Sequence, residues 1–175
     1  MKRPPQRLDL PARRSDNDKR RLHPAPDMAT LSRLSDHVCY RGIAKHKAHP
    51  TEFGLATGSI RRGDATLCDE HAGFDRWAMA GIPQLLRRGI DAGLVGKTLD
   101  RGVPTIIWTI SGTGWIFEVR LTNVAVFEYH GYPVRPTEAI AEPVYVRFRD
   151  WAAGEGTDED REAATMCKAL YGFRR

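Results

Sequence analysis

Charged and imidazole side chains recur at alternate positions in stretches rich in β-branched and aromatic residues: Glu118, Arg120, Glu128, His130 and Arg147. Metal-independent cleavage of a phosphodiester needs a carboxylate that removes a proton, an imidazole that donates one, and guanidinium groups that neutralise the phosphate. We therefore predict catalytic roles for these residues, with Glu118 or Glu128 as the base and His130 as the acid. The alternative is an ordinary solvated sheet face held by Glu–Arg pairs between strands.

Four further residues are candidates for binding a substrate: Arg149, Tyr129, Tyr132 and Arg41. Tyr129 and Tyr132 flank a histidine and a glycine, where aromatic rings can stack on a base, although packing at a strand end is the alternative. Arg41 lies on an expected early strand. An arginine there, with Glu118 or Glu128 on a later strand, is similar to the pattern of ADP-ribosyltransferases, but their usual Ser-Thr-Ser element is missing.

A second polar concentration lies upstream: Cys39, His46, His49, Asp64, Cys68, Asp69 and His71. Cys68 and His71 have the two-residue gap common in structural zinc sites, and Cys39 with His46 or His49 could complete four ligands. The first half lacks a standard spacing, and reduced cysteines in a core with histidines in solvated loops are the commoner arrangement. We therefore predict no metal and no cofactor, and keep a zinc-stabilised interaction domain as an alternative.

The elements that must position the first set are predicted strands over residues 105–110, 115–122, 126–130 and 144–149, where apolar and polar residues alternate with a period of two. Residues 82–90 carry a helical apolar stripe that would cover one face of the sheet. Residues 158–171 read as a C-terminal helix capped by Thr157. We predict an α+β fold: helices packed on one face of a mainly antiparallel sheet of about four to five strands, the charged face open.

This order, a helical layer followed by an antiparallel sheet, resembles the architecture of barnase and RelE-type toxin nucleases in layout and residue types alone. The resemblance implies RNA cleavage by a Glu base, a His acid and phosphate-binding arginines.

The formal net charge of +5 belongs to one end of the chain, because residues 1–21 hold eight basic and three acidic residues. With five prolines and few large apolar residues, residues 1–27 are predicted to be a disordered basic arm. Residues 28–175 are predicted to be a single globular domain.

The function that we predict is that of a small cytoplasmic, toxin-like or effector-like ribonuclease. The expected partners are RNA or another polyanion and a protein inhibitor, and no membrane. Three irregularly spaced cysteines favour reduced thiols, and no apolar run is long enough to cross a bilayer.

Overall fold

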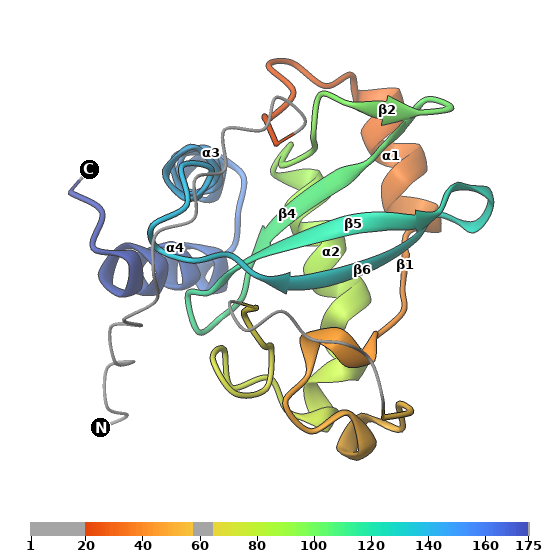
Figure 1. The fold of residues 1–175 in the computed structure, drawn as a ribbon. Helices are drawn as coiled ribbons and strands as arrows, with labels where there is room; N and C mark the ends of the chain where they lie inside the picture. The colour runs from red at the N-terminus through yellow and green to blue at the C-terminus, as the bar shows by residue number, and fades with distance from the viewer. Residues whose placement is uncertain (1–19, 58–64, 175) are drawn as a thin grey trace.

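The computed structural model describes residues 20–57 and 65–174, which form an α+β fold of four helices and a mainly antiparallel four-stranded sheet (Figure 1). The helices are α1 (Met28–His37), α2 (Ile82–Asp91), α3 (Ala141–Gly154) and α4 (Asp158–Tyr171). The sheet contains β1 (Cys39–Tyr40), β4 (Ile106–Ile110), β5 (Ile116–Asn123) and β6 (Glu128–Pro133), while β2 (Leu99–Asp100) pairs with β3 (Val103–Pro104) separately. The predicted fold class and the C-terminal helix are confirmed.

The strand order in the sheet is β1-β6-β5-β4, with β1 parallel to β6 and the other neighbours antiparallel. Arg120 lies opposite His130, and Glu118 lies between Tyr132 on β6 and Trp108 on β4. Directly opposed residues project from the same face of a sheet. We call the face that carries Glu118, Arg120, His130 and Tyr132 the polar face.

The other face of the sheet is covered by α1 and α2. The residues that form this core include Leu34, Leu86, Ile90, Ile107, Val119 and Tyr129. α2 approaches the sheet closely at Gly89, where an added Cβ would lie 2.1 Å from the carbonyl oxygen of Trp108. A glycine inside a helix is intrinsically unfavourable, and here the close approach of the two backbones requires it.

The polar face is not wholly open, because α3 and α4 pack beside it at its β4 end (Figure 1). Val144 and Phe148 of α3 share a core with Trp108 and Ile116, and Cys167 of α4 belongs to the same cluster. The expectation that the face opposite α2 stays open is therefore wrong. The polar side chains of Arg120, His130 and Tyr132, which β5 and β6 carry, do not belong to that cluster.

The predicted strand over residues 144–149 is part of α3. Val144, Tyr145, Phe148 and Ala152 are buried at spacings of one, four and eight residues, which is a single helical face. Pro143 lies in the first turn, where its missing N–H is tolerated. The β-branched and aromatic residues of this stretch favour a strand locally, and packing against β4 overrides that preference.

β6 is displaced along the chain from the predicted strand over residues 126–130, because it begins at Glu128 and continues to Pro133. Val124–Val126 forms the 3-10 helix η4, and Phe127 follows with a φ of 52°. Pro133 is accommodated as the final strand residue, a position that tolerates the missing N–H. His130 therefore lies in mid-strand, with Tyr132 beyond it on the same face.

Part of the expected N-terminal arm packs on the body of the protein. Leu22 forms a β-bridge with Gly96, and the amide of His23 donates to the carbonyl of Val95 at 2.8 Å. The carbonyl of Arg21 accepts from the Lys97 amide at 3.0 Å. The predicted boundary at residue 27 thus does not match the packing of residues 20–23, and residues 1–19 lie outside the described residues.

Within the described ranges, no helix combines the length and apolar character needed to span a membrane. Cys39, Cys68 and Cys167 are free thiols, which agrees with the expectation that no disulfide framework supports this fold.

Candidate functional site

Two histidines from distant parts of the sequence stack on the polar face. His46 is the last residue of the 3-10 helix η1 (Ala44–His46), and its ring lies 5.6 Å from that of His130 at an interplanar angle of 11°. The His46 ring also lies 4.9 Å from the ring of Tyr132. One histidine of the upstream cluster therefore joins the predicted catalytic set, and we call His46 and His130 the histidine pair.

The alternation of β6 decides which of its aromatic residues reach this pair. His130 and Tyr132 lie on the polar face, while Tyr129, the residue before His130, faces the core under α1 and α2. Tyr129 is fully buried, and its hydroxyl donates to the carbonyl of Pro104 at 2.6 Å. A substrate-binding role for Tyr129 is therefore wrong, whereas Tyr132 lies beside the histidine pair and its predicted contact with a substrate stays a prediction.

Glu118 is completely buried, and its two carboxylate oxygens accept four hydrogen bonds. The four donors, with their distances, are Arg20 Nε at 2.7 Å, Trp108 Nε1 at 3.1 Å, Arg120 Nε at 2.8 Å and the Tyr132 hydroxyl at 2.5 Å. Burial raises the pKa of Glu118, but the charge of Arg20, the Tyr132 hydroxyl and Arg120 together bring it below its ordinary value. Since an ionised carboxylate accepts about four hydrogen bonds, Glu118 has no lone pair left for general base catalysis. Its role is to organise its neighbours.

Arg120 links Glu118 to the histidine pair. Its Nη2 lies 2.8 Å from Glu118 Oε1, and 40% of its side chain is exposed. The register of β5 and β6 places it directly opposite His130. Arg120 can therefore present positive charge beside His130 while Glu118 holds the other side of its guanidinium group.

Both rings of the histidine pair have strongly depressed pKa values. Burial, and then the charges of His130, Lys45, Lys47 and Arg120, lower the pKa of His46 to about 3. Burial, Lys45 and Arg120 lower the pKa of His130 to about 4. Both imidazoles are therefore neutral at pH 7 in a positive local field, and a bound anion would relieve that field.

Hydrogen bonding distinguishes the two rings. His130 Nδ1 lies 2.8 Å from the hydroxyl of Thr122, which fixes the ring and leaves Nε2 available. Neither ring nitrogen of His46 has a hydrogen-bond partner among the described residues, although both are shielded from solvent. Unpaired buried polar atoms are costly and frequently mark functional positions.

The other predicted glutamate, Glu128, is half-buried at the start of β6, opposite Cys39 of β1. It lies two residues before His130 on the same strand, and its charge acts with burial to raise the pKa of the Cys39 thiol. A role for Glu128 as a base stays a prediction. Arg41 follows β1 as an exposed residue whose amide donates to the Tyr129 carbonyl at 2.8 Å. Its predicted contact with a substrate also stays a prediction.

Arg147 and Arg149 do not belong to this site, because α3 carries them away from the sheet. Arg147 Nη1 donates to the carbonyls of His23 at 2.6 Å and Gly93 at 3.0 Å. Arg149 pairs with the neighbouring Asp150 at 2.6 Å. The catalytic role predicted for Arg147 and the substrate contact predicted for Arg149 are therefore wrong, because residues 144–149 form part of helix α3 instead of the predicted strand.

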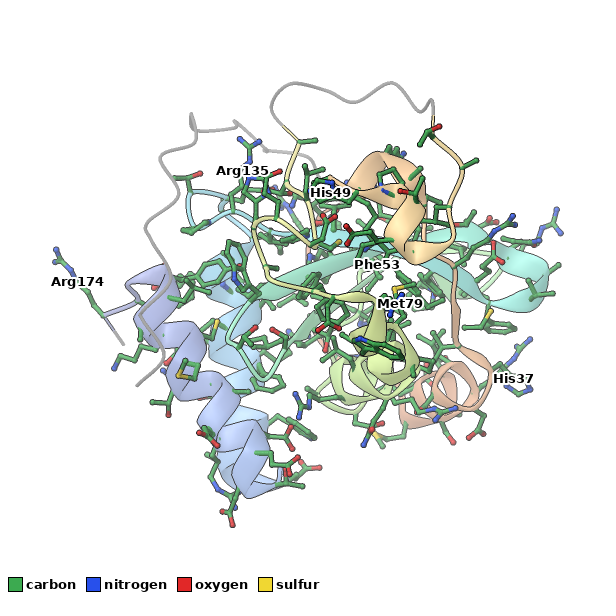
Figure 2. All side chains as sticks on the ribbon, turned by 90° about the horizontal axis from the view of Figure 1, so that it is seen from below. His37, His49, Phe53, Met79, Arg135 and Arg174 are labelled. Carbon is green, nitrogen blue, oxygen red and sulfur yellow. The ribbon has the colours of Figure 1, made fainter. Side chains whose placement is uncertain are left out.

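The remaining members of the upstream cluster have separate structural tasks. The Asp69 carboxylate accepts hydrogen bonds from the amides of Ala48 and His49, and His71 Nδ1 accepts one from the Leu67 amide. The described residues contain no group of three or more His, Cys, Asp or Glu side chains arranged to hold a metal ion, while Asp64 lies outside them. Figure 2 shows His49 near the 3-10 helix η2 (Pro50–Phe53) and His37 at the end of α1, on different sides of the protein.

Arg20 and Lys45 are the site residues that sequence reasoning missed. Arg20 lies in a segment with no apolar periodicity, so nothing local indicated that it is buried. The sequence offers His46 only as a possible ligand in the zinc alternative, and its basic neighbours Lys45 and Lys47 are the signal that could have indicated an anion site.

Comparisons with protein-family models, with curated proteins and with solved structures found no match to this chain. The resemblance to barnase and RelE-type nucleases therefore rests on layout and residue types alone.

Proposed function

We propose that the protein binds RNA on the polar face and cleaves it without a metal ion, using the histidine pair to transfer protons. The observation that supports this most directly is the pair itself: two stacked imidazoles 5.6 Å apart, neutral at pH 7, with Arg120 on the same face. Arginine and lysine beside neutral imidazoles favour a bound phosphate, since an anion both pairs with the cations and raises the pKa values of the rings.

In the proposed reaction His46 is the general base and His130 the general acid. His130 takes the acid role because the Thr122 hydroxyl, 2.8 Å from Nδ1, fixes its ring and leaves Nε2 to donate the proton. His46 accepts the proton of the ribose 2′-hydroxyl while the 2′ oxygen bonds to phosphorus. The bond from phosphorus to the 5′ oxygen breaks, and His130 gives that oxygen its proton. The products are a 2′,3′-cyclic phosphate and a 5′-hydroxyl, and Arg120 neutralises charge on the phosphorane.

Substrate binding must also uncover His46, whose ring nitrogens are shielded from solvent. This exposure requires the segment that ends at His46 to move away from His130 and Tyr132, although the His46 carbonyl accepts a hydrogen bond from the Cys68 amide at 3.0 Å.

The proposal predicts an acidic pH optimum. The productive state needs one proton on the pair, and in the free protein the pKa values are about 3 and about 4. The population of that state rises as pH falls, so kcat/KM on RNA should increase about tenfold per pH unit from pH 7 to pH 5. Initial rates on a fluorescent oligoribonucleotide across this range measure the slope. A flat profile would contradict the assignment of His130 as the acid.

The direct test is cleavage of an oligoribonucleotide in the presence of a chelator. The unmodified protein should produce 2′,3′-cyclic phosphate ends and should leave the matched 2′-O-methyl oligonucleotide intact. His130→Ala and His46→Gln should each lower the rate by about 10²–10⁴-fold. His49→Gln is the matched control, because His49 is exposed and is not in contact with the pair. RNA binding without cleavage would show that the protein is an RNA-binding protein and not a nuclease. Loss of cleavage on chelation would overturn the metal-independent mechanism.

A further inference from the structure

We infer that Arg20 is a positioning residue of this site: through Glu118 it holds Arg120 and Tyr132 in the orientation in which they face the histidine pair. The inference rests on the proposed function for its kinetic consequence, but its structural part can be tested without any activity. Arg20 lies 98 residues from Glu118 in the sequence and belongs to none of the sheet strands.

The two carboxylate oxygens of Glu118 accept hydrogen bonds from two different pairs of side chains. Oε2 accepts from Arg20 Nε at 2.7 Å and from Trp108 Nε1 at 3.1 Å. Oε1 accepts from Arg120 Nε at 2.8 Å and from the Tyr132 hydroxyl at 2.5 Å. The carboxylate therefore cannot rotate toward either side without breaking charge-assisted hydrogen bonds on the other.

Arg20 uses its forked guanidinium to join two buried carboxylates. Besides Glu118, its Nη2 lies 2.6 Å from Oε2 of Glu138, and only 7% of the Arg20 side chain is exposed. Glu138 is itself fixed, because its Oε1 accepts a hydrogen bond from the Arg135 amide at 3.0 Å. Arg20 thus pairs with both Glu118 and Glu138, while Glu118 pairs with Arg120 as well.

Without Arg20, Arg120 is the remaining described guanidinium within ion-pair distance of Glu118. On its Oε2 side the Glu118 carboxylate would keep the bond from Trp108 Nε1, so it could rotate and loosen its hydrogen bond to Arg120 Nε. Tyr132, whose hydroxyl binds the same oxygen, would move with the carboxylate. A residue outside the sheet thus controls how firmly Arg120 and Tyr132 are held beside the histidine pair.

The backbone that follows Arg20 is anchored, which gives the Arg20 side chain a rigid support. The Arg21 carbonyl accepts from the Lys97 amide at 3.0 Å, and Leu22 bridges to Gly96. The His23 carbonyl accepts from Arg147 Nη1 at 2.6 Å. These contacts fix where the guanidinium enters the site, so its position does not depend on Glu118 alone.

The test is Arg20→Lys, compared with Arg88→Lys. Lysine keeps the charge but cannot reach both carboxylates with one fork. Arg88 is the matched control, because its Nε lies 2.7 Å from the buried Asp160 in an ion pair between α2 and α4 that is separate from the histidine pair. We expect Arg20→Lys to lower kcat on RNA by about 10- to 100-fold, and Arg88→Lys to leave it unchanged.

A second readout is the Nε–H resonance of Arg120 in ¹H–¹⁵N spectra. In the unmodified protein this hydrogen should exchange slowly, because it is bonded to a buried carboxylate; in Arg20→Lys it should exchange at least about tenfold faster. If Arg20→Lys fails to fold, the charge-balanced double variant Arg20→Gln/Glu138→Gln takes its place. If the unmodified protein does not cleave RNA, the proposed function fails, while the exchange rate still tests the positioning role. Unchanged exchange of the Arg120 Nε–H, or equal losses of kcat in Arg20→Lys and Arg88→Lys, would overturn the inference.

Discussion

Glu118 and Asp160 are both buried carboxylates that pair with an arginine from a distant element, yet their surroundings differ. Asp160 lies in the first turn of α4, where it completes a capping box with Thr157 and pairs with Arg88 of α2 at 2.7 Å. Glu118 pairs with two arginines and a tyrosine hydroxyl, and one side of its cluster leads to the histidine pair. Asp160 connects helices α2 and α4. Glu118 connects Arg20 to Arg120 and Tyr132 on the polar face.

This difference shows that a buried ion pair does not by itself identify a functional site. What distinguishes the cluster around Glu118 is the neighbouring histidine pair, which is neutral at pH 7 and lies near the positive charges of Arg120 and Lys45. The pKa values are about 3 for His46 and about 4 for His130. An ion pair that only stabilises the fold leaves no charged group available to a ligand. In the cluster around Glu118, Arg120 stays partly exposed beside imidazoles, which can transfer protons.

The largest expected effect is on stability, and it separates the two carboxylates. Glu118→Ala leaves Arg20 and Arg120 without their shared partner, so we expect a loss of about 3–5 kcal/mol in the free energy of unfolding. Urea denaturation at pH 7 measures it. Glu118→Gln keeps the volume and should lose less. A change of stability below about 1 kcal/mol for Glu118→Ala would show that solvent reaches the cluster.

The corresponding change at the other carboxylate should be smaller and should leave the site intact. Asp160→Asn loses the charge that pairs with Arg88 but keeps an oxygen to cap α4, so we expect a loss of about 1.5–3 kcal/mol. RNA cleavage, measured well below the melting temperature, should stay at the level of the unmodified protein. A parallel loss of cleavage would mean that the two carboxylates are coupled through the fold.

The pH dependence of stability distinguishes the histidine pair from the carboxylates. The pKa values of the two histidines in the folded protein are about 3 and about 4, and an unfolded histidine has a pKa of about 6.5. At a pH between the folded and the unfolded value, each histidine binds fewer protons in the folded protein than in the unfolded chain. Stability therefore falls as pH drops from 6.5 toward 4, and the carboxylates act below this window. We expect the melting temperature to decrease by roughly 3–6 °C from pH 7 to pH 5.

The control for that measurement is the doubly substituted His46→Gln/His130→Gln protein, whose melting temperature should change less over the same range. His49→Gln should keep the slope of the unmodified protein. Equal slopes in all three proteins would show that the pair is solvated and titrates normally.

The smallest effects should come from the arginines that α3 removes from the sheet. Arg147→Ala deprives two carbonyls of a donor and should cost about 1 kcal/mol, with no change in RNA cleavage. Arg149→Ala should change neither the melting temperature nor cleavage, because Arg149 contacts only its exposed neighbour Asp150 and the ring of Tyr145 among the described residues. A large loss of cleavage in Arg147→Ala would place it at the site after all.

Local patterns predicted the parts of the fold that depend on local physics. The alternation of β5 placed Glu118 and Arg120 on one face, and Thr157 with the acids of the following turn predicted where α4 begins. His130 and Tyr132 were recognised as candidates because their residue types suit phosphate and base recognition. Such features are determined by a residue and its neighbours within one or two turns.

The rest was decided by contacts between residues far apart in the chain. Residues 144–149 satisfy the period of a strand and of a helix alike, and only packing against β4 selects α3. The burial of Glu118 depends on Arg20, 98 residues away, and the histidine pair forms only when η1 lies against β6. By itself the sequence determined the α+β class and the residue types of the candidate site. The tertiary structure decided which of them meet, because burial and charge pairing act across distances in sequence that no local pattern records.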